Sequence, residues 1–171
     1  MKSRRVLPAW LKYFCIIAGI CSIGVLILYI LSNTVYYKLF TNRIIAELPK
    51  AKSSECYYSD GFQDYTDYCK YYYTDKVLNT LEKSSHFKQV SEEDTAEIQS
   101  YFENFEGWVK YEKYQDSYDF DKSIISDGDY FYIQNKDTYE RYADYPDKYA
   151  AYNVYFFDTE TLTLYFIHSN I

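Results

Sequence analysis

The stretch Tyr152–His168 reads YNVYFFDTETLTLYFIH and predicts a β-hairpin near the C-terminal end. Two runs rich in aromatic and β-branched residues, Tyr152–Phe157 and Leu162–His168, flank the short polar segment DTET. Such runs are typical of strands, and a polar segment between them is typical of a hairpin loop. The run Asp129–Asn135 (DYFYIQN) has the same character. The sequence therefore predicts an antiparallel sheet in the C-terminal part of the chain.

The clearest predicted helix begins at Ser91. Ser91 and Asp94 form the Ser-x-x-Asp capping pattern, and the acidic first turn suits the positive end of the helix dipole. Apolar side chains then recur at helical spacing and predict the buried face of the helix. They are Ile98, Tyr101, Phe102, Phe105, Trp108 and Val109. A shorter helix is predicted over Asp75–Lys83. Together these elements predict an α+β domain, with one main amphipathic helix packed on a C-terminal antiparallel sheet.

The segment before the helices shows no clean period. Ser53–Thr74 is rich in Tyr, Asp and Ser, and we expect an extended or turn-rich entry with a short strand near Tyr68–Tyr73. Thr138–Ala151 is expected to be a surface loop or a broken helix around Pro146.

Charge is distributed unevenly along the chain. From Ser53 onward there are 24 acidic and ten basic side chains, a net charge of about −14. So acidic a domain repels phosphate backbones, which argues against nucleic-acid binding. Solubility alone is the preferred explanation of this acidity, and a basic partner or cation-rich surroundings are the alternative. The chain also has 24 tyrosines in 171 residues, whose half-apolar rings suit strand faces and interfaces.

A transmembrane helix is predicted over Tyr13–Leu31, because no charged residue occurs between Lys12 and Lys38. At 1.5 Å per residue this segment would span about 28 Å, close to the hydrocarbon thickness of a bilayer. A cleaved signal peptide is the alternative, but the residues after Leu31 make a poor cleavage site. An uncleaved signal anchor in the lipid bilayer is therefore the preferred interpretation.

The basic flanks suggest an orientation and an organisation. Residues 1–12 would form a cytoplasmic basic tail, 13–31 the transmembrane helix and 32–52 a juxtamembrane helix or linker. Residues 53–171 would form an acidic, tyrosine-rich extracytoplasmic domain. The sequence thus predicts a single-pass protein of the cell membrane with its N-terminus in the cytoplasm.

The four cysteines fall into two pairs. Cys15 and Cys21 lie in the predicted span and are interpreted as small apolar residues. Cys56 and Cys69 lie in the predicted domain. In an oxidising environment they can form a disulfide worth about 3 kcal/mol, and two free thiols are the open alternative.

No pattern predicts catalytic, cofactor-binding or metal-binding residues. The two histidines, His86 and His168, lack an accompanying nucleophile motif or metal-ligand spacing. Carboxylates cluster in three places without the spacing of a calcium loop, and turn chemistry explains the Asp-Gly-Asp segment better. They are Asp60, Asp64 and Asp67; Asp116, Asp119 and Asp121; and Asp127 and Asp129.

Three segments carry a resemblance: YNVYFFDTETLTLYFIHSNI (152–171), GFQDYTDYCKYYY (61–73) and YDFDKSIISDGDYFYI (118–133). They resemble a loose group of small single-pass membrane proteins of Gram-positive, Firmicutes-type bacteria. The resemblance implies a cell type, and it supplies neither an activity nor catalytic residues.

These observations favour a non-enzymatic, membrane-anchored protein-interaction module, with an immunity or accessory protein as one specific form. Two other classes remain open. One is a small cell-envelope hydrolase with two converging carboxyl groups of raised pKa. The other is a regulatory subunit that acts through its membrane span.

Overall fold

The computed structural model describes residues 22–25, 42–60, 65–135 and 149–170. The chain divides into two compact units, residues 1–47 and 48–171, and each is described by itself. In the first unit, residues 22–25 are helical and α2 spans Arg43–Glu47. Asn42 begins α2 as an N-cap, because its Oδ1 accepts a hydrogen bond of 3.1 Å from the Ile44 N–H.

The structure contradicts the predicted membrane anchor. Among the residues described, no helix is both long and apolar enough to cross a bilayer. The helical residues 22–25 span only about 6 Å, against a hydrocarbon core of about 30 Å. The rest of Tyr13–Leu31 lies outside the described residues, as do residues 1–12 and most of 32–52. The predictions of a transmembrane signal anchor, a single-pass membrane location and an extracytoplasmic domain are therefore wrong.

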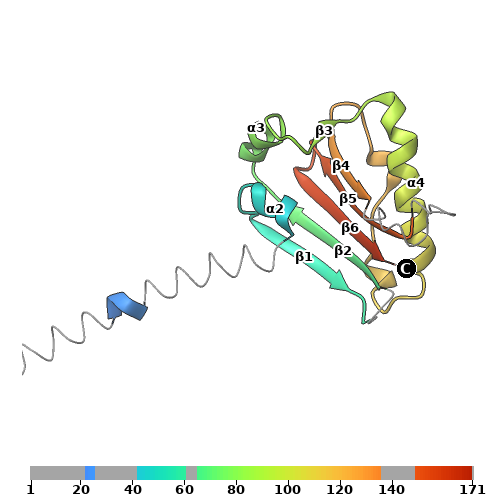
Figure 1. Cartoon of the computed structure of the whole chain (residues 1–171), viewed down its shortest axis with the longest axis horizontal. Coiled ribbons are helices and arrows are strands. Elements are labelled where there is room, and N and C mark those ends of the chain that lie inside the picture. The colour runs from blue at the N-terminus through green and yellow to red at the C-terminus, as the bar shows by residue number, and fades with distance from the viewer. Residues whose placement is uncertain (1–21, 26–41, 61–64, 136–148, 171) are drawn as a thin grey trace, which may run out of the picture. The chain divides into compact units, whose positions relative to one another are not determined.

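One six-stranded antiparallel sheet forms the second unit, in the order β1-β2-β6-β5-β4-β3 (Figure 1). The strands are β1 Ser53–Tyr58, β2 Tyr65–Tyr72, β3 Lys88–Gln89, β4 Tyr130–Asn135, β5 Ala151–Asp158 and β6 Thr163–Asn170. The last strand, β6, lies between β2 and β5. It therefore joins the N-terminal hairpin β1–β2 to the C-terminal strands. The predicted hairpin of β5 and β6 is confirmed.

The predicted fold class is wrong about the sheet as well as the anchor. Two of the six strands, β1 and β2, precede the helices, so the sheet is not C-terminal but extends through the whole unit. The edge strand β1 has four exposed and two half-exposed positions among its six, so no apolar period marks it in the sequence. The inner strand β2 has four buried positions among its eight and overlaps the short strand predicted near Tyr68–Tyr73.

In the described part of the second unit, the helices are short with one exception. They are η1 Asp75–Val77, α3 Leu78–Leu81, α4 Glu92–Val109, η2 Gln115–Ser117 and η3 Lys122–Ile124. Helix α4 lies along one face of the sheet (Figure 1). Its predicted capping is confirmed: the Ser91 N–H and Oγ both donate to Asp94 Oδ2, at 3.1 and 2.6 Å. Trp108 departs from the predicted stripe, since it is 42% exposed.

Apolar side chains cover both faces of the sheet. On the α4 face, Phe102 and Phe105 are fully buried, and the ring of Phe102 stacks on that of Phe120 with centroids 3.8 Å apart. On the opposite face, Tyr155 and Phe157 are fully buried. Burial on both faces explains why β5 is an almost continuous apolar run.

Candidate functional site

Strand β4 has an outer edge that β3 covers only in part. β3 pairs Lys88 with Phe131 and Gln89 with Tyr130, and then it ends. The Val90 N–H donates to the Asp129 carbonyl at 2.7 Å, so the odd-numbered residues of β4 direct their backbone groups outward. Ile133 is the next residue in this series. Its N–H and C=O face away from β5, and its side chain lines the groove along this edge.

The chain turns away from the edge where a longer β3 would pair with Ile133. In a continued ladder His86 would lie opposite Ile133, given the register of Lys88 with Phe131. Instead, the N–H groups of His86 and Phe87 donate to Ser84 Oγ, at 3.1 and 3.3 Å. No residue that the structure describes therefore pairs with the outward backbone groups of Ile133.

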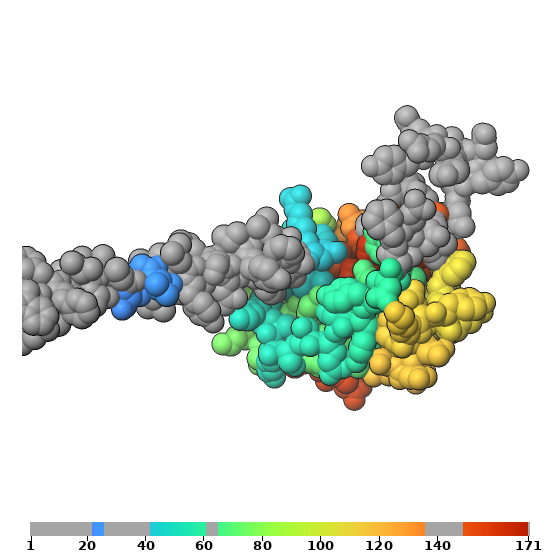
Figure 2. Space-filling model, turned by 90° about the horizontal axis from the view of Figure 1, so that it is seen from below, coloured from blue at the N-terminus to red at the C-terminus, as the bar shows by residue number. Residues whose placement is uncertain are grey.

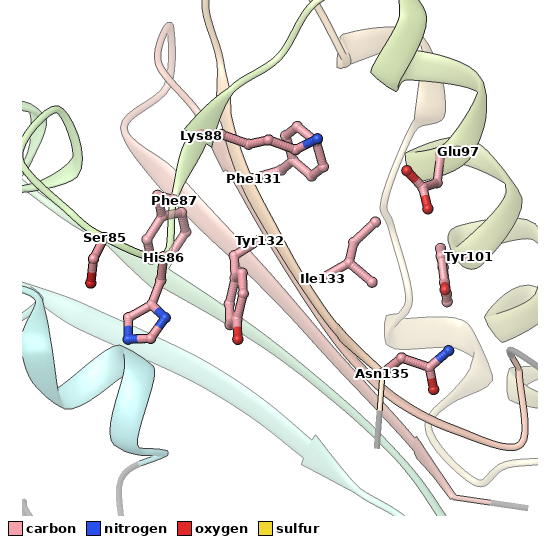
Figure 3. A pocket seen from close by; sticks show the side chains of 10 residues that line it. All are labelled: Ser85, His86, Phe87, Lys88, Glu97, Tyr101, Phe131, Tyr132, Ile133 and Asn135. Carbon is pink, nitrogen blue, oxygen red and sulfur yellow. The ribbon is translucent and has the colours of Figure 1, made fainter. Parts of the chain in front are cut away.

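A groove of about 730 Å³ follows this open edge (Figure 3). That volume is in the range of binding sites for ligands the size of a short peptide segment. Figure 3 shows Glu97 and Tyr101, from α4, on one side of Ile133, and His86 and Tyr132 on the other. The residues that line the groove are Ser85, His86, Phe87, Lys88, Glu97, Tyr101, Phe131, Tyr132, Ile133 and Asn135.

At one end of the groove, β3 is tied to the start of α4 by an ion pair. Lys88 Nζ lies 2.7 Å from Asp94 Oδ1 and 4.4 Å from the centroid of the Phe131 ring. The hydrogen bond from Lys88, followed by those from Ser91, lowers the pKa of Asp94. The positive charge of Lys88 is therefore already neutralised by Asp94 of α4.

Two further carboxylates of α4 have no such partner. Glu93 and Glu97 are exposed and stand four residues apart, so they lie on the same side of the helix. Within the described part of the chain, neither forms an ion pair with a basic side chain. Like charges at this spacing destabilise a helix by about 0.2–0.5 kcal/mol. A bound cation beside Glu97 would relieve that repulsion.

The opposite side of the groove is aromatic and firmly supported. The rings of His86 and Tyr132 lie with centroids 5.1 Å apart, and Tyr132 stacks on the buried Tyr155 at 5.7 Å. Phe87 meets Tyr155 edge-on at 6.2 Å. Because these rings brace one another, Tyr132 offers a fixed surface for an apolar side chain. Sequence reasoning missed this groove, since its residues come from three separate segments.

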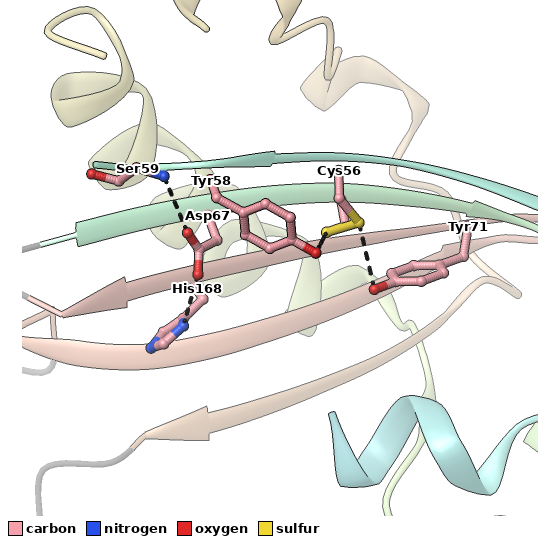
Figure 4. Close-up of a disulfide and its surroundings, with 7 residues drawn as sticks. Cys56, Tyr58, Ser59, Asp67, Tyr71 and His168 are labelled. Atoms are coloured by element: carbon pink, nitrogen blue, oxygen red, sulfur yellow. Dashed lines mark hydrogen bonds and ion pairs between the residues drawn. A yellow bond between two sulfur atoms is a disulfide. The ribbon is translucent and has the colours of Figure 1, made fainter. Parts of the chain in front are cut away.

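A second polar cluster surrounds the cysteine pair in the β1–β2 hairpin (Figure 4). Cys56 and Cys69 lie directly opposite each other and form a disulfide, with Cα atoms 4.1 Å apart. The Tyr71 hydroxyl lies 3.6 Å from Cys56 Sγ, and the Tyr58 hydroxyl lies 4.0 Å from Cys69 Sγ. The bridge therefore fastens the edge strand β1 to the rest of the sheet.

The histidines occupy unrelated places. His86 lines the groove, whereas His168 Nδ1 lies 3.4 Å from Asp67 Oδ2 at the far end of β6. Asp67 also accepts a hydrogen bond of 3.3 Å from the Ser59 N–H, and the Tyr65 ring meets the His168 ring edge-on at 4.8 Å. In the described ranges, no group of three or more His, Cys, Asp or Glu side chains is arranged to hold a metal ion.

The other predicted carboxylate clusters do not form common sites, and their members bind separate parts of the domain. Asp119 Oδ2 pairs with the buried Lys70 at 2.7 Å, and its Oδ1 accepts from the Tyr68 hydroxyl at 2.8 Å. Burial alone would raise the pKa of Asp119, but these two bonds lower it. Figure 2 shows the neighbourhood: the teal surface of β1 and β2 adjoins the yellow segment that follows α4.

The remaining acids mostly hold turns. Asp60 pairs with Lys113, and Asp121 accepts from the Ser123 N–H at 2.9 Å. Asp129 is buried and accepts from Ser126 and Thr159 across the turn that contains Gly128. These bonds, and the φ of +94° at Gly128, support the interpretation of Asp-Gly-Asp as a turn. Asp116 and Asp127 are exposed, and Asp64 lies outside the described residues.

Comparisons with known proteins add no family to this description. No family model matches the chain, and neither a curated protein nor a solved structure matches it.

Proposed function

We propose that residues 48–171 form a protein-interaction domain that binds a basic partner, without catalysing a reaction. The observation that carries this proposal is the exposed carboxylate of Glu97, which lines the groove along β4 and lies about one helical turn from the exposed Glu93. Within the described part of the domain, neither Glu93 nor Glu97 forms an ion pair with a basic side chain, whereas Asp94 between them is paired with Lys88.

The charge of the whole domain supports the same proposal. With about 24 acidic and ten basic side chains beyond residue 52, the domain attracts cations from a distance and repels phosphate backbones. Long-range attraction of this kind raises association rates and selects partners by charge. A basic protein surface is therefore a better partner than a nucleic acid.

The shifts in carboxyl pKa do not favour the hydrolase alternative. A carboxylate-dependent hydrolase needs one acid whose pKa is raised. Among the described residues, the aspartates whose pKa values are displaced all move downward, because each accepts hydrogen bonds or faces a lysine. Glu97 is also the only carboxylate among the residues that line the groove.

The experiment is a selection from a random peptide library with the immobilised full-length chain. We expect enrichment of sequences that contain Lys or Arg, with micromolar affinities that weaken as salt screens the charges. The variant Glu97→Gln should weaken binding severalfold. The matched control is Asp116→Asn, which also removes one exposed charge, in η2 at the other end of α4. No enrichment, or equal weakening by the control, would refute the proposal.

A further inference from the structure

We propose that the partner binds as an added β-strand along the outer edge of β4, with a Lys or Arg opposite Ile133 that pairs with Glu97. This inference rests on the proposed function, and it names the binding mode and the residue that the partner must present. An extended peptide that joins an exposed sheet edge obtains affinity from backbone hydrogen bonds and specificity from alternate side chains.

The open edge has a place for such a strand. The ladder between β3 and β4 ends at the pair of Lys88 with Phe131, and the described residues form no backbone hydrogen bond to the outward N–H or C=O of Ile133. The His86 N–H, which a longer β3 would direct at the Ile133 C=O, donates to Ser84 instead. An unpaired edge of this kind is a template for another strand. The groove along it provides the room that the backbone and side chains of the peptide need.

The protein's own β3 shows which side chain belongs there. Lys88 lies opposite Phe131 and places its ammonium group 2.7 Å from Asp94. The position opposite Ile133 is the next equivalent place along the same edge, about 7 Å further on. Glu97 lies about 4.5 Å further along α4 than Asp94. A long, flexible basic side chain opposite Ile133 would therefore reach Glu97 as Lys88 reaches Asp94.

The alternation of a strand fixes the rest of the peptide. Residues directly opposite each other in an antiparallel pair place their side chains on the same face, so the basic residue shares the α4 face with Ile133. Its neighbours in the peptide then face Tyr132 and His86 on the other side. This edge should therefore select peptides in which basic and apolar residues alternate. In such a peptide, the backbone N–H groups of the basic residues point at β4.

The probe is the synthetic peptide acetyl-Thr-Val-Lys-Val-Lys-Val-Thr-amide, titrated against the full-length chain by isothermal titration calorimetry. In one version the backbone amide nitrogens of both lysines are methylated. In a matched version the backbone amide nitrogens of two valines are methylated. The two versions have the same charge, composition and number of methyl groups. We expect lysine methylation to weaken binding about tenfold or more, because it removes the hydrogen bonds to β4, and valine methylation to weaken it less than about threefold.

Amide hydrogen exchange gives the second reading. Addition of the peptide should slow exchange of the Ile133 N–H, while the Tyr132 and Gln134 amides, which face β5, should change little. If the peptide binds but the two methylated versions weaken equally, strand addition is wrong and the charge-based function stands. If no version of the peptide binds at any salt concentration, both proposals are wrong.

Discussion

Reduction of the Cys56–Cys69 disulfide should destabilise the domain by about 3 kcal/mol without unfolding it. The bridge closes a loop with a sequence separation of 13. In the chain-entropy model a loop of this length contributes about 3 kcal/mol at 25 °C, by restricting the unfolded chain. The native state should persist, because β1 is also held by six residue pairs with β2.

Urea unfolding of the full-length chain, with and without a reductant, measures this difference. For a domain of this size, 3 kcal/mol corresponds to a midpoint shift of roughly 1–3 M urea. The variant Cys56→Ala/Cys69→Ala is the control, since a reductant should not change its stability. Because Cys69 is buried, this variant also loses some packing, and reduction of the natural chain is the cleaner comparison. A shift below about 1 kcal/mol on reduction, with the bridge shown to be open, would refute the entropy argument.

Three further outcomes can be measured by the same unfolding assay. Asp119 has a lowered pKa in the folded state, so the stability from its bond with Lys70 is present above about pH 4 and lost at lower pH. The variant Asp119→Asn should therefore lose less unfolding free energy on acidification than the natural chain, and equal losses would contradict this. Gly128 has a φ of +94°, so Gly128→Ala should cost about 1 kcal/mol or more even though the nearest atom to the added Cβ is 3.7 Å away; a neutral effect would show that the turn relaxes. Phe105→Ala should cost about 3–5 kcal/mol and Trp108→Ala well under that, because only Phe105 is fully buried; equal costs would contradict the observed orientation of α4.

The sequence was informative where one local pattern decided the outcome. Ser91 and Asp94 predict the start of α4 because capping depends on residues three apart. The hairpin of β5 and β6 is predictable because its two strands are neighbours in the chain and are rich in strand-forming residues. Trp108 fits the helical period of the apolar stripe, yet it is 42% exposed, whereas Phe105 and Val109 of the same stripe are buried.

The sequence was misleading where position in the fold mattered. The apolar run Tyr13–Leu31 suggested a membrane span, which the described part of the chain does not contain. The place of β6 between β2 and β5 depends on a pairing between residues about 100 positions apart, such as Tyr68 with Ile167. No local period records a pairing of that kind. The groove depends in the same way on the end of β3 at Gln89, which only the register reveals.

The most direct test of basic-partner recognition is a double-mutant cycle between Glu97 and the two lysines of the bound peptide. The natural chain and Glu97→Gln are each titrated with the lysine probe and with a matched probe that carries norleucine in place of both lysines. We expect the two changes to be coupled by about 0.5–1 kcal/mol, a two- to fivefold effect that decreases with salt. Additive changes, with no coupling at low salt, would show that Glu97 does not read the positive charge of a partner.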